Sequence, residues 1–232
     1  MNASELLQVW EVGRGLPPLE RVIFLLTCAG WHDAGSLTVG QKNRALISLY
    51  EQLFSPQLAC VAHCPKCSTQ LEFGLSTTLL ASSAEHEPQQ TLTLDLQAYT
   101  LTVRQPQLRD LQIAEGRGAS LYERCVVEAR SGKETVAFEM LPESARLNVA
   151  EALLLDDPML DIQLALDCPE CGASWKSPLD LLAFLWQEIE RWGQRMLYTI
   201  HRLASAYGWS EEEILALSAW RRNGYLDLIN HG

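Results

Sequence analysis

Two short segments of the chain have nearly the same sequence, His63-Cys64-Pro65-Lys66-Cys67-Ser68 and Asp167-Cys168-Pro169-Glu170-Cys171-Gly172. In each, a Cys-Pro-x-Cys motif, below called a knuckle, follows an apolar run typical of a strand, and a polar turn with a second short apolar run comes after it. Each knuckle supplies two thiolates from one tight turn, and a tetrahedral structural zinc site needs four. We therefore expect one structural Zn2+ on four ligands: Cys64, Cys67, Cys168 and Cys171.

The two knuckles are far apart in the chain, because 100 residues separate Cys67 from Cys168. An ordinary zinc ribbon separates its two Cys pairs by only about 15–20 residues. We therefore expect an α+β fold that is mainly helical, with a small split zinc-ribbon β element that joins two distant segments. The expected parts are an N-terminal helical segment at 1–55, the split ribbon with an inserted hairpin and helices at 56–178, and a C-terminal long helix with short helices at 179–232. We expect them to form one compact unit.

Hydrophobic spacing assigns the elements within these parts. Helical periodicity predicts helices through 2–55 and through 106–156, with a surface turn at 131–134 within the second stretch. Polar–apolar alternation predicts a hairpin at 91–103. Ser177-Pro178-Leu179-Asp180 has the residues of a helix start, a Ser N-cap followed by Pro. The long helix that it opens is expected to end at Gly208, and Ser210 is expected to cap the next helix.

Composition and charge restrict the class of protein. The chain has 232 residues, 47% of them hydrophobic, and a net charge of −11, which opposes binding to a nucleic-acid backbone. The start lacks the pattern of a secretory signal, and the longest clean apolar run, Val22 to Leu26, is too short to span a bilayer. We expect a cytoplasmic protein with reduced cysteines, without nucleic-acid or membrane partners. Cys28, Cys60 and Cys125 are expected to be buried small hydrophobes.

Motifs of catalysis are missing from the sequence. It has no Gly-rich phosphate loop, no Gly-x-Ser-x-Gly elbow and no His-Glu-x-x-His pair. Asp156-Asp157 could be a paired-carboxylate site, but their position before Pro158 favours a solvated turn at a helix end. We expect no catalytic residues, no small-molecule substrate and a non-enzymatic role, since zinc with four thiolates has no open coordination position.

The long C-terminal helix has apolar residues on more than one face, which is typical of a helix that is buried or that docks a partner. Both readings remain open, and for Trp186 and Trp192 burial in the protein's own core is at least as plausible. Trp, Tyr and Arg dominate the energetics of protein interfaces. The expected partner surface therefore comprises Trp186, Trp192, Tyr198, His201, Trp209, Arg221, Arg222 and Tyr225.

The C-terminal part also resembles a known family. The matching residues are Ser177-Pro178-Leu179-Asp180, 184–189, 201–204, 207–211, 214–217, Arg221-Arg222 and Tyr225-Leu226. They resemble the signature of the phage baseplate hub assembly chaperones, which occur with contractile tails and phage-tail-like injection systems. The larger zinc-ribbon variety matches further residues: Trp10-Glu11, Gly13, 18–21, Val39-Gly40, Arg44, Phe54, 64–67, 71–73, 103–106, Asp110-Leu111 and 123–125. Residues 76–98 and 130–145 are unmatched, and Ser68 stands where a Gly usually follows the knuckle.

The resemblance implies a baseplate assembly chaperone or structural adaptor whose partners are baseplate, hub or spike proteins of a contractile tail. It leaves open whether the protein stays in the finished particle. Two other classes remain. One is a zinc-ribbon nucleic-acid-binding or regulatory module, which a basic stripe on the folded surface would favour. The other is a metal-dependent hydrolase, which an open coordination position would favour.

Overall fold

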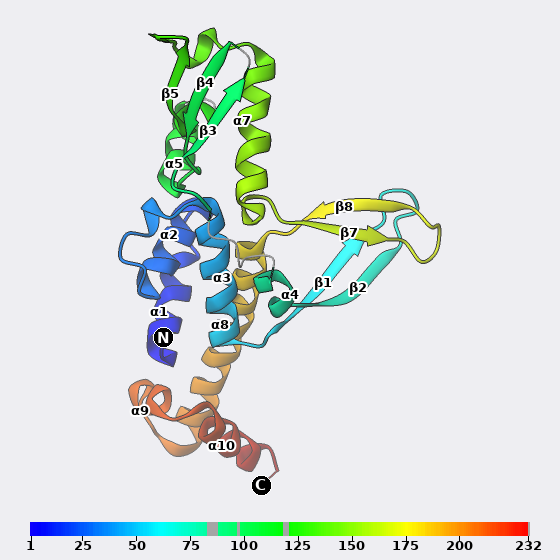
Figure 1. Cartoon of the computed structure of the whole chain (residues 1–232). Helices are drawn as coiled ribbons and strands as arrows, with labels where there is room; N and C mark the ends of the chain where they lie inside the picture. The colour runs from blue at the N-terminus through cyan, green and yellow to red at the C-terminus, as the bar shows by residue number, and fades with distance from the viewer. Residues whose placement is uncertain (83–87, 97, 118–120, 232) are drawn as a thin grey trace. The chain divides into compact units, whose positions relative to one another are not determined.

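The computed structural model describes residues 1–82, 88–96, 98–117 and 121–231. Over these residues the fold is α+β and mainly helical, with small antiparallel sheets, as expected (Figure 1). The chain divides into two compact units, of which unit 1 comprises residues 1–32 and 182–232, and unit 2 comprises residues 33–181. These boundaries differ from the expected ones at 55 and 178. Helix α3 (Val39–Leu53) belongs to unit 2 because it packs against the 3-10 helix η3 (Pro158–Leu160).

Unit 1 is helical. Its elements are α1 (Ala3–Gly13), α2 (Pro18–Cys28), α8 (Leu181–Tyr207, in this unit from Leu182), α9 (Glu211–Ala216) and α10 (Ala219–His231). Helix α8 ends at Tyr207 and is followed by Gly208, which has a φ of 71°, and Ser210 caps α9 together with Glu213, so both of these predictions are confirmed. The predicted start of α8 was wrong. Ser177 and Pro178 instead pair with the neighbouring strand, and the helix begins at Leu181.

Two tryptophans pack on glycines within unit 1. The ring of Trp10 on α1 lies where a side chain at Gly193 of α8 would be, and Trp186 lies in the same way against Gly13. The Trp10 Nε1–H donates to Glu190 at 2.9 Å. The Arg21 guanidinium lies 4.5 Å from the centroid of the Trp186 ring. Only glycine allows either ring this close, so α1 and α8 depend on both glycines for their packing.

Unit 2 contains the strands. They are β1 (Gln57–His63), β2 (Gln70–Ser76), β3 (Leu92–Leu96), β4 (Tyr99–Val103), β5 (Val126–Ser131), β6 (Glu134–Thr135), β7 (Gln163–Asp167) and β8 (Ser174–Pro178). Strands β1–β2 and β7–β8 form two separate hairpins, and β3–β4–β5–β6 form the larger sheet. The further helices are α4 (Thr77–Ser82), α5 (Leu108–Arg117), α6 (Leu121–Cys125), α7 (Glu143–Asp156) and two short 3-10 helices, η1 (Ala34–Ser36) and η2 (Phe138–Met140).

The larger sheet confirms the predicted hairpin and corrects a predicted helix. Strands β3 and β4 pair from Leu92↔Val103 to Leu96↔Tyr99, with Gln97 at the joint outside the described residues. Residues 126–130 were expected to belong to a helix, but they lie in strand β5. The surface turn expected at 131–134 is confirmed, since Gly132, with a φ of 61°, lies in the turn that joins β5 to β6. Ala129 of β5 joins a core in which α7 covers one face of the sheet. Val126 packs against the same core, and this burial of one side of β5 stabilises the strand.

The expected solvated turn at Asp156-Asp157 is also corrected. Asp157 is completely buried, and its two carboxylate oxygens accept from the Arg44 guanidinium at 2.8 and 3.0 Å. Asp156 is buried as well and accepts from Gln105 Nε2 at 3.0 Å. The two carboxylates therefore tie the end of α7 to α3 and to the segment after β4, as structural anchors within unit 2.

Candidate metal centre

The two knuckles have the same backbone geometry. At the first, the Cys64 N–H donates to Thr69 O at 2.9 Å and the Ser68 N–H donates to Cys64 O at 2.9 Å. At the second, the Cys168 N–H donates to Ala173 O at 2.9 Å and the Gly172 N–H donates to Cys168 O at 3.0 Å. Each loop is closed by a ladder of antiparallel pairs, His63↔Gln70 and Asp167↔Ser174 being the last. The hairpins therefore hold each Cys pair in a fixed turn.

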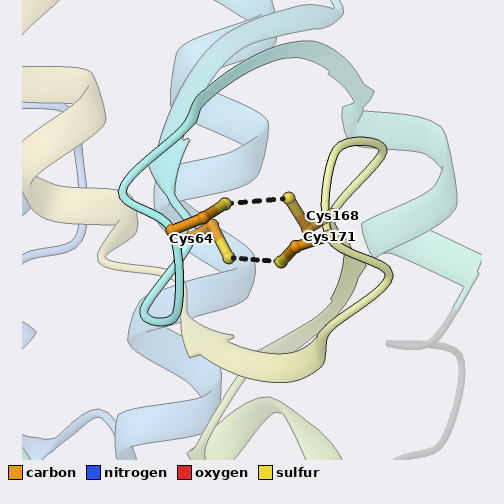
Figure 2. Close-up of side chains that lie close together, drawn as sticks. Cys64, Cys168 and Cys171 are labelled. Atoms are coloured by element: carbon orange, nitrogen blue, oxygen red, sulfur yellow. Dashed lines mark hydrogen bonds between the residues drawn. The ribbon is translucent and has the colours of Figure 1, made fainter.

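The cysteines of both knuckles meet at one place in unit 2. Figure 2 shows the side chain of Cys64 directed toward those of Cys168 and Cys171. The Sγ atoms of Cys64 and Cys171 are 3.6 Å apart, and so are those of Cys67 and Cys168. All four Sγ atoms lie within 4.8 Å of one another, and none is in a disulfide. The predicted ligand set is thus assembled in space, and it could hold a metal ion.

The four sulfur ligands differ in exposure. Cys64 and Cys168 are buried, Cys67 is exposed and Cys171 is intermediate, so one side of the cluster faces solvent. The Thr69 hydroxyl lies 3.2 Å from Cys67 Sγ. By hydrogen bonding to the thiolate, Thr69 lowers the pKa of the Cys67 thiol. A metal binds the thiolate, so Thr69 favours binding at the most exposed ligand. The sequence reasoning had not identified Thr69.

The other three cysteines lie apart from the cluster. Cys60 and Cys125 are buried, as expected, and burial raises the pKa of Cys125 to about 12, so it remains a thiol. The expectation for Cys28 was wrong. Cys28 is the last residue of α2 and is exposed, because it falls on the outward side at the end of that helix.

The residues of the expected partner surface lie in unit 1 and differ in exposure. Tyr198 is 57% exposed, and His201 and Arg221 are also exposed. Trp186 and Trp192 are intermediate, and Trp186 is fixed between Gly13 and Arg21.

Trp209 and Tyr225 belong to an aromatic cluster. The Trp209 ring stacks on Tyr207 at 4.7 Å and meets Tyr225 edge-on at 4.9 Å. Both residues are intermediate in exposure. The cluster joins the end of α8 to α10. These two rings therefore contribute to the packing of unit 1, and only part of their surface is accessible to a partner.

Arg222 is not part of the accessible surface, although it was expected to bind a partner. It is only 6% exposed, and its Nη1 donates to Leu215 O at 3.1 Å and to Leu217 O. These carbonyls are at the C-terminal end of α9, where the last C=O groups of a helix have no N–H partner within the helix itself. Arg222 therefore caps α9, whereas its neighbour Arg221 is directed outward.

Trp220 is an exposed aromatic residue that the sequence reasoning missed. It is 83% exposed, and with Arg221, Gly224, Tyr225 and Leu228 it lines a groove of about 320 Å³ on α10. The i, i+4, i+8 spacing of Trp220, Gly224 and Leu228 was a signal that could have identified this face in the sequence.

Comparison with known proteins adds nothing to these observations, because no family model, no curated protein and no solved structure matches the chain. Among the residues that the structure describes, no helix has both the length and the apolar character needed to cross a membrane.

Proposed function

We propose that the protein is a non-enzymatic assembly chaperone or structural adaptor for the baseplate of a contractile, phage-tail-like injection system. The observation that carries the proposal is the uneven distribution of contact-forming residues. Unit 1 contains six of the seven tryptophans and seven of the fourteen arginines, but none of the four lysines, which are all in unit 2. Trp10 and Arg222 are buried in the packing of unit 1, whereas Trp220, Arg195 and Arg221 are exposed. Enrichment in Trp and Arg with depletion of Lys is the composition of protein–protein interfaces.

We further propose that the metal is zinc and that its role is structural. Tetrahedral zinc with four sulfurs at about 2.3 Å places the sulfurs about 3.8 Å apart. Two of the Sγ–Sγ separations between the knuckles are 3.6 Å, and all separations in the cluster are within 4.8 Å. A zinc ion would fill the site with only a small adjustment. It would use all four ligands and join two segments that are 100 residues apart.

The two units divide the proposed role. In unit 2 the metal fixes the hairpins, while unit 1 offers Tyr198, His201, Trp220, Arg221 and part of Tyr225 to a baseplate, hub or spike protein. The family resemblance supports the same assignment, since it is densest in residues 177–226. The protein could act in the cytoplasm or remain in the assembled particle.

Co-purification tests the proposal. The tagged chain is expressed together with any sheath, tube, spike and hub proteins that its source genome encodes, and bound proteins are identified by mass spectrometry. We expect capture of a baseplate, hub or spike protein, and its loss in a Trp220→Ala/Arg221→Glu/Tyr225→Ala variant that keeps its metal and helix content. A matched Arg130→Glu/Lys133→Glu variant in unit 2 should retain the partner. Capture of none of these proteins by the parent chain would overturn the proposal.

A further inference from the structure

The solvent-exposed side of α8 presents a row of three arginines and one tyrosine. Arg191, Arg195, Tyr198 and Arg202 follow one another at i, i+4, i+7 and i+11, which places them on one face of the helix. We call these four residues the arginine stripe. The opposite face is apolar and buried, with Leu185, Ile189, Met196 and Leu203. Since the helix rises about 1.5 Å per residue, the stripe extends over about 17 Å.

Local contacts hold the side chains of the stripe in place while leaving them accessible. Arg202 Nη2 donates to Asn230 Oδ1 at 3.0 Å, and its guanidinium carbon lies 5.9 Å from the centroid of the Tyr198 ring. Arg191 pairs with Glu188 at 2.6 Å and keeps half of its side-chain surface exposed. In the part of the chain that the structure describes, no carboxylate pairs with Arg195, which is exposed.

The charge of the stripe stands out against the rest of the chain. The whole protein has a net charge of −11. Unit 2 accounts for most of it, with 20 acidic against 11 basic residues, whereas unit 1 has nine acidic and seven basic residues. Three of those seven basic residues are in the arginine stripe, so one helix face collects positive charge in an acidic molecule. Arg guanidinium groups match the planar geometry of carboxylates.

We propose that the arginine stripe docks an acidic segment of a partner protein. Carboxylates spaced along one face of a partner helix would meet the three guanidinium groups in turn, and Tyr198 would supply the apolar contact between them. This inference rests on the proposed adaptor function and specifies the chemistry of the partner.

A nucleic acid fits the stripe less well. Its phosphates continue beyond the 17 Å or so that the stripe covers. Unit 1 as a whole is weakly acidic, and Glu211, Glu212 and Glu213 follow α8 in the sequence, which opposes binding of a longer polyanion. A short acidic protein segment avoids this repulsion because its charge can end where the stripe ends.

Binding of a designed peptide tests the inference. The probe is a labelled helical peptide with Glu at i, i+4, i+7 and i+11, compared with the same peptide carrying Gln, and binding to the full chain is followed by fluorescence anisotropy. We expect salt-sensitive binding of the Glu peptide only. An Arg191→Glu/Arg195→Glu variant should weaken it by at least about tenfold, and Arg195→Gln by less. The Arg130→Glu/Lys133→Glu control changes the charge equally and should leave the affinity unaltered.

Each contrary outcome has a definite meaning. Equal binding of the Glu peptide by the stripe variant and the control variant would overturn the inference, and so would absence of binding to the parent chain. Tighter binding of a single-stranded 12-mer oligonucleotide at the stripe would replace the acidic protein with a nucleic acid. Peptide binding at the stripe without co-purification of injection-system proteins would contradict the adaptor function alone. Co-purification without peptide binding would contradict the stripe alone.

Discussion

Ser68 and Gly172 occupy equivalent positions, each directly after the second cysteine of a knuckle, and both have a left-handed backbone. Their φ angles are 60° and 68°, and each N–H donates to the carbonyl of the first cysteine of its knuckle. Ser68 is the one non-glycine residue with positive φ among the described residues. The turn of each knuckle therefore requires a left-handed backbone at this position, even where the residue is serine, which adopts that conformation less readily than glycine.

Ser68→Gly should stabilise the protein. A residue with a Cβ in the left-handed region costs about 1 kcal/mol relative to glycine. We expect the free energy of unfolding of the metal-loaded protein, measured by urea denaturation, to rise by about that amount. The matched change Gly172→Ser should lower it by a similar amount. A loss of stability in Ser68→Gly would show that the serine side chain makes a contact that outweighs the backbone cost.

Gly193→Ala should destabilise unit 1, whereas Gly224→Ala should not. A Cβ at Gly193 would overlap the Trp10 ring, while a Cβ at Gly224 would meet nothing within 4 Å. Overpacking of this kind costs about 1–3 kcal/mol, and replacing an exposed helical glycine by alanine gains up to about 1 kcal/mol. Thermal unfolding followed by Trp fluorescence measures both changes. Equal shifts in the two variants would contradict the packing of α1 on α8.

Asp110 should make the stability of unit 2 depend on pH. Its burial raises its pKa, but hydrogen bonds from Arg104, the Gln107 N–H and Arg124 outweigh this and keep the pKa below its usual range. Since the pKa is lower in the folded state, the stabilisation is complete above the unfolded value of about 3.9 and is lost as the pH falls through the folded value.

The variant Asp110→Asn tests this. Removing one partner of a fully buried ion pair costs about 3–5 kcal/mol. We expect a smaller loss, about 2–3 kcal/mol at neutral pH, because the side chains of Arg104 and Arg124 are 28% and 31% exposed. The difference in unfolding free energy between parent and variant should shrink below about pH 4. Release of a bound metal at low pH would destabilise the parent and the variant alike. The quantity to follow is therefore the difference between their unfolding free energies. A difference independent of pH would contradict the ion pair.

Sequence reasoning identified the cysteine cluster because its signal is local. Each Cys-Pro-x-Cys motif defines its own turn, and matching motifs imply a shared site whatever lies between them. The N-cap of α9, Ser210, and the glycine after α8 were predicted for the same reason.

The errors involve contacts between distant residues. Residues 126–131 form a strand because side chains on one of its faces pack in one core with Val149 and Leu153 of α7. The spacing of apolar residues within 126–131 does not show this contact. Asp157 is buried because Arg44, far away in the chain, approaches it. Arg222 was predicted to face a partner, but the carbonyls that it caps become available only once α9 ends at Ala216.

Native mass spectrometry of the purified chain tests the central claim, that four cysteines hold one zinc ion between the two knuckles. We predict the mass of the reduced chain with one zinc ion bound, and loss of that ion in each Cys→Ser variant at Cys64, Cys67, Cys168 and Cys171, while Cys28→Ser retains it. A folded chain with no bound metal, or one whose mass shows a disulfide between the knuckles, would contradict the account.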